Sequence, residues 1–280
     1  LSQIVAAGEV VEREGSHSGN GDKDWLRDFD GWDLPAYCYV RWHLPPTPVE
    51  TSGLTRSTIT QLPQAHHRTL ADDVLSSLQA PEGQEPKPTN PVRDDEILEF
   101  LISEGLRPGT ADELTNTMRR IRLLAEYYQH NVEWTEVREH ETRTFLIVPL
   151  LLSLGWAEQQ MRIELPAAGG RADLVCFSKP AHLSDSECVL ILESKGFSSG
   201  LDYAPEQARR YAEDFPSCRV VIVSNGFCYK SYRRLETGGF SDRPSAYFNI
   251  SGPRDKYPLD PDSVEGTFEL LRCLLPQSLR

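Results

Sequence analysis

Three charged residues interrupt segments that are otherwise apolar. Asp173 lies inside RADLVCF (171–177), and Glu193 ends the run CVLILE, with Ser194 and Lys195 directly after it. A charge in a buried strand costs several kcal/mol unless it is paired or binds a metal. Two such acids therefore predict a shared cation, and hard carboxylate oxygens favour Mg²⁺, with Mn²⁺ expected to substitute.

The Glu193-Ser194-Lys195 triplet has a spacing that suits hydrolysis. Strand alternation places Glu193 and Lys195 on one face and Ser194 on the other. The ammonium can then position or deprotonate a metal-bound water, and the Ser194 main-chain carbonyl is a further candidate metal ligand. Taken alone, Glu193 and Lys195 are better explained as an ordinary surface pair at a strand end. The chemistry depends on their coupling to Asp173.

Segments around these residues predict an α/β fold with a mixed central sheet flanked by helices. A helix is predicted over 139–155, with Pro149 implying a kink or a late start and Gly155 a C-terminal stop. The remaining elements follow in the order of three strands, a helix and two strands, namely 160–165, 171–177, 188–194, 203–215, 219–224 and 227–233, the last as an edge-type strand.

Two further helices are predicted before this core, beginning at Asp94 and at Thr110, the second with a Thr110–Glu113 capping box. Residues 1–93 are rich in Gly, Pro, Ser and Thr and are expected to be irregular, apart from a strand over 36–44 and a short helix over 71–78. A linker is predicted near 81–93. The irregular region suggests the tail of a larger partner domain, and the opening Leu1 suggests a fragment.

Overall charge argues against a protein that coats nucleic acid non-specifically, because the net charge is -13. The stretch from Lys195 to Arg234 nevertheless carries seven basic residues against four acidic ones. Six scattered cysteines form no CxxC pair, so neither zinc nor disulfides are assigned. No apolar run is long enough to span a membrane and no signal-like segment opens the chain, so a cytoplasmic protein is expected.

Several short motifs occur together in one order. These are ETR (141–143), PLLLSLGW (149–156), GRADLV (170–175), VLILESK (189–195), EQARRYA (206–212) and VIVSNGF (221–227). The set resembles the PD-(D/E)xK nuclease superfamily, and above all the N-terminal nuclease domain of type I restriction enzyme motor subunits and its stand-alone relatives. The resemblance covers residues 139–234. Ala172 stands where the superfamily name implies proline, at a position that varies and binds no metal.

This resemblance implies a restriction-endonuclease-like core of αβββαβ order within a domain spanning 94–280. Asp173, Glu193 and the Ser194 carbonyl would bind Mg²⁺, and Lys195 would be the catalytic lysine. Glu141 would support the metal shell through water, although an acid favoured by the helix dipole explains it almost as well and Glu139 competes for the role. Gln207 would face the site, supported by Tyr211, unless the two only pack.

The expected function is a Mg²⁺-dependent DNA endonuclease in restriction or phage defence. DNA is the expected partner, a methyltransferase or motor subunit is a candidate, and a homodimer would serve double-strand cutting. No membrane partner is expected. The alternative from a different class is a non-catalytic DNA-binding or assembly module that retains the nuclease fold.

Overall fold

The computed structural model describes residues 2–4, 7–12, 15–20, 36–43, 49–51, 69, 89–130, 137–167, 170–197, 200–201 and 204–279. The chain divides into two units, one comprising 1–22 and 34–85 and the other 23–33 and 86–280. The predicted linker near 81–93 contains the boundary at 85. The helix predicted over 71–78 lies outside the described residues.

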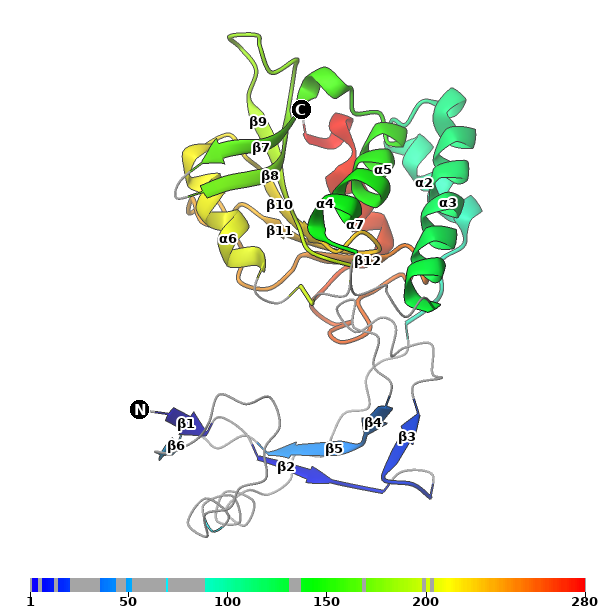
Figure 1. Cartoon of the computed structure of the whole chain (residues 1–280), viewed down its shortest axis with the longest axis vertical. Helices are drawn as coiled ribbons and strands as arrows, with labels where there is room; N and C mark the ends of the chain where they lie inside the picture. Colours follow the sequence, from blue (N-terminus) through cyan, green and yellow to red (C-terminus); the bar gives the residue numbers. More distant parts are fainter. Residues whose placement is uncertain are drawn as a thin grey trace. The chain divides into compact units, whose positions relative to one another are not determined.

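The described residues of the first unit form three antiparallel pairs of short strands (Figure 1). β1 (Ser2–Ile4) pairs with β6 (Val49–Thr51), β2 (Ala7–Val10) with β5 (Val40–His43), and β3 (Ser18–Asn20) with β4 (Ala36–Cys38). The single strand predicted over 36–44 is thus two strands, β4 and β5, separated at Tyr39.

A six-stranded mixed sheet forms the centre of the second unit, in the order β12-β11-β10-β9-β8-β7. Its strands are β7 (Met161–Ala167), β8 (Gly170–Phe177), β9 (Cys188–Ser194), β10 (Val220–Ser224), β11 (Cys228–Arg233) and β12 (Ala246–Asn249). Only β9 and β10 are parallel, and all other neighbours are antiparallel. Every residue of β9 and β10 is buried, as their uninterrupted apolar runs require.

The prediction of β11 as an edge strand is wrong, because β12 pairs with it and forms the edge instead. The first five residues of β11 are buried, although two of them, Lys230 and Ser231, are polar. The buried charge of Lys230 is stabilised because its ammonium lies over the ring of Tyr257, 5.6 Å from the centroid.

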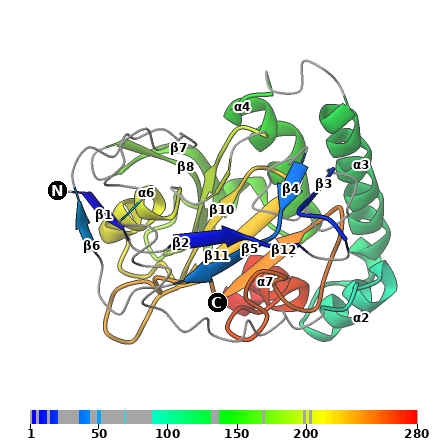
Figure 2. The ribbon, with the colours of Figure 1, turned by 90° about the horizontal axis from the view of Figure 1, so that it is seen from below.

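Helices cover both faces of the sheet, which makes the second unit an α/β protein (Figures 1 and 2). α6 (Ala204–Tyr211) lies on one face, continued by the 3₁₀ turn η6 (Ala212–Asp214). α5 (Val148–Ser153) and α7 (Thr267–Leu274) lie on the other face, and α7 is followed by η7 (Pro276–Leu279). α7 contacts β11 and β12, whereas α6 contacts β8, β9 and β10.

A helical lead-in forms an outer layer against α5 and α7. α2 (Asp94–Ser103) is followed by the 3₁₀ turn η2 (Pro108–Thr110) and the long α3 (Ala111–His130). Arg122 joins the two helices, donating to both Asp94 carboxylate oxygens at 2.7 Å and to the Ile250 carbonyl at 2.6 Å. Thr110 donates its hydroxyl to the Arg107 carbonyl at 2.8 Å and is the last residue of η2, directly before α3.

The helix predicted over 139–155 changes its winding in the middle. α4 (Glu139–Thr142) passes into a π-helical segment, η4 (Arg143–Ile147), before α5 begins. Pro149 lacks an N–H group and therefore cannot continue the α-helical ladder, and the Val148 N–H bonds instead to the Arg143 carbonyl. The expected kink thus takes the form of a π turn that rotates Arg143 relative to α5. Gly155 ends the helix at a φ of +100°.

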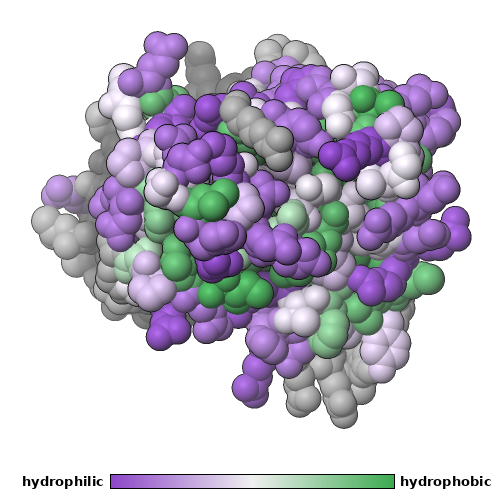
Figure 3. Space-filling view, turned by 90° about the horizontal axis from the view of Figure 1, so that it is seen from above, coloured by the Kyte–Doolittle hydropathy of each residue, from purple (hydrophilic) through white to green (hydrophobic). Residues whose placement is uncertain are grey.

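Hydrophilic side chains dominate the face shown in Figure 3, with hydrophobic residues in separate small patches. In the described part of the chain, no helix has both the length and the hydrophobicity needed to cross a membrane. A 3₁₀ turn, η5 (Glu158–Gln160), leads from the helical layer into β7.

Candidate active site

Asp173 and Glu193 lie side by side at one end of two antiparallel strands. Leu174 on β8 pairs with Leu192 on β9, and the next residue of each strand at this end is one of the two acids. Residues opposite each other in an antiparallel pair share a face of the sheet. Glu193 is only 1% exposed, although it is the last residue but one of β9.

Lys195 directs its ammonium toward a ring of oxygen atoms. Nζ lies 2.9 Å from Glu193 Oε1, 3.5 Å from Gln207 Oε1 and 3.7 Å from Glu139 Oε1. The main chain is fixed as well, because the Lys195 N–H donates to the Ser224 carbonyl at 2.8 Å. The side chain is therefore positioned by β9, β10, α4 and α6 together.

Gln207 and Tyr211 form the α6 side of this site. Gln207 Nε2 donates to Tyr211 Oη at 2.8 Å, which turns the amide oxygen toward Lys195. Tyr211 Oη reaches the start of β8, where a Cβ at Gly170 would lie only 2.7 Å from it. Glycine at this position lets the tyrosine approach the strand closely.

The two candidate helix acids differ in position. Glu141 Oε2 accepts a hydrogen bond from the Arg138 N–H at 3.2 Å and thereby caps the first turn of α4. Glu139 is the acid whose carboxylate faces Lys195. The structure thus brings Glu139, rather than Glu141, toward the Asp173–Glu193 pair.

Arg143 is a site residue that the sequence patterns do not single out, although it ends the ETR motif. Its side chain is 6% exposed, and Nη1 lies 2.7 Å from Asp173 Oδ1. Nη2 lies 3.0 Å from Glu164 Oε1, on a residue whose φ is +53°. A positive φ at a residue other than glycine is uncommon and marks local strain. This conformation accompanies the bridge from Glu164 through Arg143 to Asp173.

Ser194 also contacts Asp173, contrary to the strand alternation that would turn it to the opposite face. Both its N–H and its hydroxyl donate to Asp173 Oδ2 at 2.7 Å. β9 ends at Ser194, so the strand pleat no longer dictates where this side chain points. Asp173 is therefore engaged at both oxygens, by Arg143 and by Ser194.

Glu193 is a buried acid with a strongly raised pKa. Its Oε2 is buried without a hydrogen-bond partner among the described residues. Burial raises the pKa of Glu193 to about 7, and the neighbouring Asp173 charge adds to this rise while Lys195 opposes it. Burial lowers the pKa of Lys195, but its hydrogen bond to Glu193 and the surrounding acids outweigh that effect and raise it.

A divalent cation would supply a partner for one oxygen atom of this site. The orphaned Glu193 Oε2 is a hard oxygen that lacks a positive partner, and a cation there would remove the cost of ionising it. Among the described residues, no three His, Cys, Asp or Glu side chains converge as a ready metal cage. The protein ligands would then be the two acids and a main-chain carbonyl, with water completing the shell.

Some of the basic residues between Lys195 and Arg234 stabilise the fold through contacts within the protein. Arg234 donates to the carbonyls of Cys218, Gly238, Ala212 and Phe215. Arg209 donates to the Ser241 carbonyl at 2.6 Å and stacks on the Tyr232 ring. Arg171, two residues before Asp173, is paired more loosely, because its Nη1 lies 3.9 Å from Glu164 Oε2 and its side chain is 67% exposed.

Comparison with models of known protein families, with curated protein sequences and with solved structures gave no match. The arrangement of side chains at the ends of β8 and β9 is therefore the basis for assigning a function.

Proposed function

We propose that residues 139–234 form the core of a Mg²⁺-dependent DNA endonuclease of the PD-(D/E)xK type, within a domain spanning 94–280. One observation carries the proposal. Asp173, Glu193 and Lys195 converge at one sheet end, and the buried Glu193 oxygen has no partner among the described residues. A buried acid without a partner is costly, and cation binding offers a reason to retain it.

The sheet supports the fold class within this proposal. β7, β8 and β9 form an antiparallel meander, and α6 then connects β9 to the parallel β10. Such a helical crossover places the end of β9 and the start of α6 close to each other. This arrangement is why Lys195 and Gln207 can contact one another, as a restriction-endonuclease-like core would require.

Each residue has a distinct role in the proposed reaction. Asp173, Glu193 and the Ser194 carbonyl would hold Mg²⁺, which when bound supplies an acidified water and a counter-charge for the phosphate. Lys195 orients the attacking water and neutralises charge that develops on the phosphate. Gln207 restrains the ammonium, and Glu139 faces the same space from α4 and supports the metal shell through water.

DNA is the proposed substrate despite the net charge of -13. The exposed Arg171 lies on β8 beside the acids and is suited to contact a phosphate flanking the scissile bond. Restriction or phage defence is the proposed setting, with a methyltransferase or motor subunit as partner, or a second copy of the chain for double-strand cutting.

A plasmid cleavage assay tests the proposal. The wild-type chain should nick or linearise plasmid DNA in Mg²⁺ but not in EDTA, and Asp173→Asn and Lys195→Ala should lose this activity. Lys179→Ala is the matched control, since Lys179 is exposed and pairs with Asp185 in the loop after β8. Equal activity in all four proteins would show that a contaminant or another site cleaves the DNA.

The alternative is a DNA-binding or assembly module without catalysis, and one observation favours it. Arg143 and Ser194 already satisfy both oxygens of Asp173, so the acid has an internal cation as partner. Calorimetric titration separates the two functions. DNA binding without any heat of Mg²⁺ or Mn²⁺ binding would support the module and exclude the enzyme.

A further inference from the structure

At the end of the sheet remote from the acid pair, Cys188 starts β9, and Cys218 lies two residues before the first residue of β10. The parallel pairing of the two strands begins at Val220 and Leu190. Two hydrogen bonds keep the segment before β10 beside the start of β9. The Arg219 N–H donates to the Val189 carbonyl at 3.0 Å, and Ser217 Oγ donates to the Cys188 carbonyl at 2.8 Å.

Cys188 Sγ lies 3.9 Å from the Leu190 carbonyl and Cys218 Sγ 3.3 Å from the Val220 carbonyl, and the two thiols are close enough for each to shift the pKa of the other. Neighbouring strands of a sheet lie about 4.8 Å apart, and disulfides span Cα separations of roughly 4.4–6.8 Å. Adjacent segments of a sheet thus lie within the range of Cα separations that a disulfide spans. Both cysteines are free in the structure, and both are buried.

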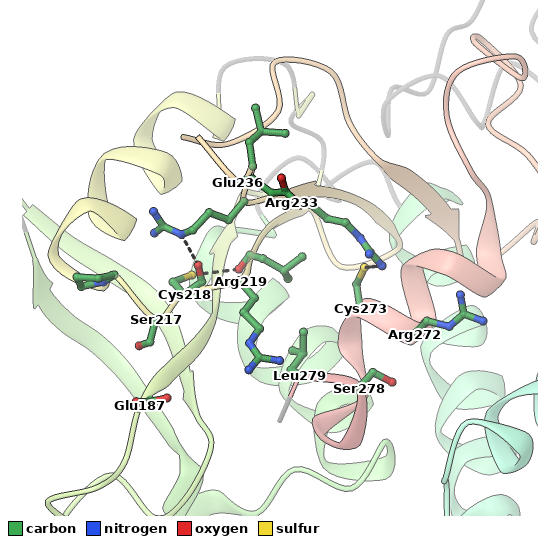
Figure 4. Close-up of a pocket in the computed structure, with 14 residues that line it drawn as sticks. Glu187, Ser217, Cys218, Arg219, Arg233, Glu236, Arg272, Cys273, Ser278 and Leu279 are labelled. Carbon is green, nitrogen blue, oxygen red and sulfur yellow. Dashed lines mark hydrogen bonds between the residues drawn. The ribbon is translucent and has the colours of Figure 1, made fainter. Parts of the chain in front are cut away.

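A pocket of about 650 Å³ is lined in part by Cys218, which is itself buried, whereas Cys188 is not among the lining residues. Figure 4 shows Cys218 in the lining of this pocket with Arg219, Arg233 and Cys273. An oxidant that enters this pocket needs to reach only one sulfur atom of the pair.

The pair is also chemically asymmetric. Interaction with the Cys188 thiol lowers the pKa of Cys218, and the nearby Arg234 guanidinium lowers it further, while burial opposes both. Interaction with Cys218 and burial raise the pKa of Cys188. A thiolate is the reactive form of cysteine, so Cys218 is the attacking sulfur and Cys188 the resolving one.

We propose that Cys188 and Cys218 form a redox modification site, which hydrogen peroxide converts to an intramolecular disulfide. Cys218 sulfur attacks one peroxide oxygen, the O–O bond breaks, and the products are a sulfenic acid and one water. Cys188 sulfur then displaces the sulfenic hydroxyl as a second water while its own proton is lost to that leaving group. Two thiols are oxidised by two electrons and one peroxide is reduced to two waters.

This site is independent of the proposed nuclease chemistry but is connected to it through the chain. The bond would close a loop from Cys188 to Cys218 that contains β9, Lys195 and α6. A covalent link across this loop restricts the unfolded chain and so favours the folded state.

Peptide mapping of the full chain tests the proposal. The wild type is treated with peroxide, its remaining thiols are alkylated, and the unreduced digest is analysed by mass spectrometry. A cross-linked Cys188–Cys218 peptide, lighter by two hydrogen atoms, is expected together with a higher melting temperature that dithiothreitol reverses. In Cys188→Ser, dimedone should trap a sulfenic acid on Cys218, whereas Cys218→Ser should give no adduct on Cys188.

Cys273→Ser is the matched control, because Cys273 is buried and lines the same pocket beside Arg233, yet should leave the cross-link intact. The exposed Cys38 reports that the oxidant acted. Unmodified Cys188 and Cys218 under conditions that oxidise Cys38 would overturn the proposal. A cross-link from either residue to Cys176 would also overturn it, as would sulfinic acid as the main product. All of these outcomes are measured on the wild-type protein, so they do not depend on whether a variant folds.

Discussion

Asp173 Oδ1 and Arg143 Nη1 lie 2.7 Å apart, so the proposed metal ligand is held by an internal cation. Arg143 also binds Glu164, which gives it a second acid to retain when Asp173 turns to a metal. The guanidinium can therefore keep Asp173 ordered before the metal arrives without leaving an unpaired charge afterwards.

Replacing this arginine should destabilise the metal-free protein. Arg143→Gln leaves the carboxylate of Asp173 without its counter-charge, and removing one partner of a buried ion pair costs about 3–5 kcal/mol. Urea unfolding with and without Mg²⁺ measures the effect. Mg²⁺ should stabilise the variant more than the wild type, since it restores a cation beside Asp173. Arg162→Gln, at an exposed position on β7, is the control. A loss of stability that Mg²⁺ does not reduce would show that Arg143 has only a packing role.

Glu193 should make the metal-free protein less stable as the pH rises. Burial raises its pKa from an ordinary 4.5 to about 7, so between these values the folded protein keeps a proton that the unfolded chain has released. Stability falls through this window, by about 3 kcal/mol at most, and stays lower above it. Glu193→Gln should remove this component of the pH dependence, as should saturating Mg²⁺. The measurement is urea unfolding at about pH 5 and about pH 8. Identical pH profiles for the variant and the wild type would contradict the assignment.

Tyr211 should affect turnover through Gln207 rather than metal binding. Tyr211→Phe removes the hydroxyl that holds the Gln207 amide, and a hydrogen bond of this kind contributes about 0.5–1.5 kcal/mol. The expected loss in cleavage rate is therefore about 2-fold to 10-fold, with unchanged Mg²⁺ affinity. Tyr127→Phe, at an exposed position, should have no effect. A weaker affinity for Mg²⁺ in Tyr211→Phe would place the tyrosine in the metal site itself.

Gly226 should tolerate no side chain. Its φ is +95°, and an added Cβ would collide with the side chains of Leu146 and Thr142 on the adjacent helical layer. Gly226→Ala should lower the free energy of unfolding by roughly 1–3 kcal/mol. Gly238→Ala separates backbone strain from collision, because its φ is +98° with open space around it. Equal losses in the two variants would show that the contact with Leu146 contributes nothing.

The positions of the main strands and helices follow from sequence because their signals are local. Uninterrupted apolar runs predict β9 and β10, and both strands are buried throughout. The sequence patterns predict no helix or strand after Arg233, although β12 and α7 lie there. α7 has a detectable signal in its buried Leu270, Leu271 and Leu274, whereas β12 has only four residues and is defined by its pairing with β11.

The details of the site depend on tertiary geometry that local patterns do not contain. Asp173, Glu193 and Lys195 can be identified from the sequence, because charged residues are unusual within or beside apolar strands. The choice between Glu139 and Glu141 depends instead on the direction of α4, and the contact of Arg143 with Asp173 follows from the π turn after it. The adjacency of Cys188 and Cys218 likewise requires the register of two strands separated by a helix.

Binding of a metal between Asp173 and Glu193 is the central claim, and crystals soaked in Mn²⁺ test it most directly. An anomalous difference peak is expected about 2.2 Å from a carboxylate oxygen of each acid, with Arg143 still bound to Glu164. No peak there at saturating Mn²⁺, with Arg143 still bound to Asp173, would contradict it.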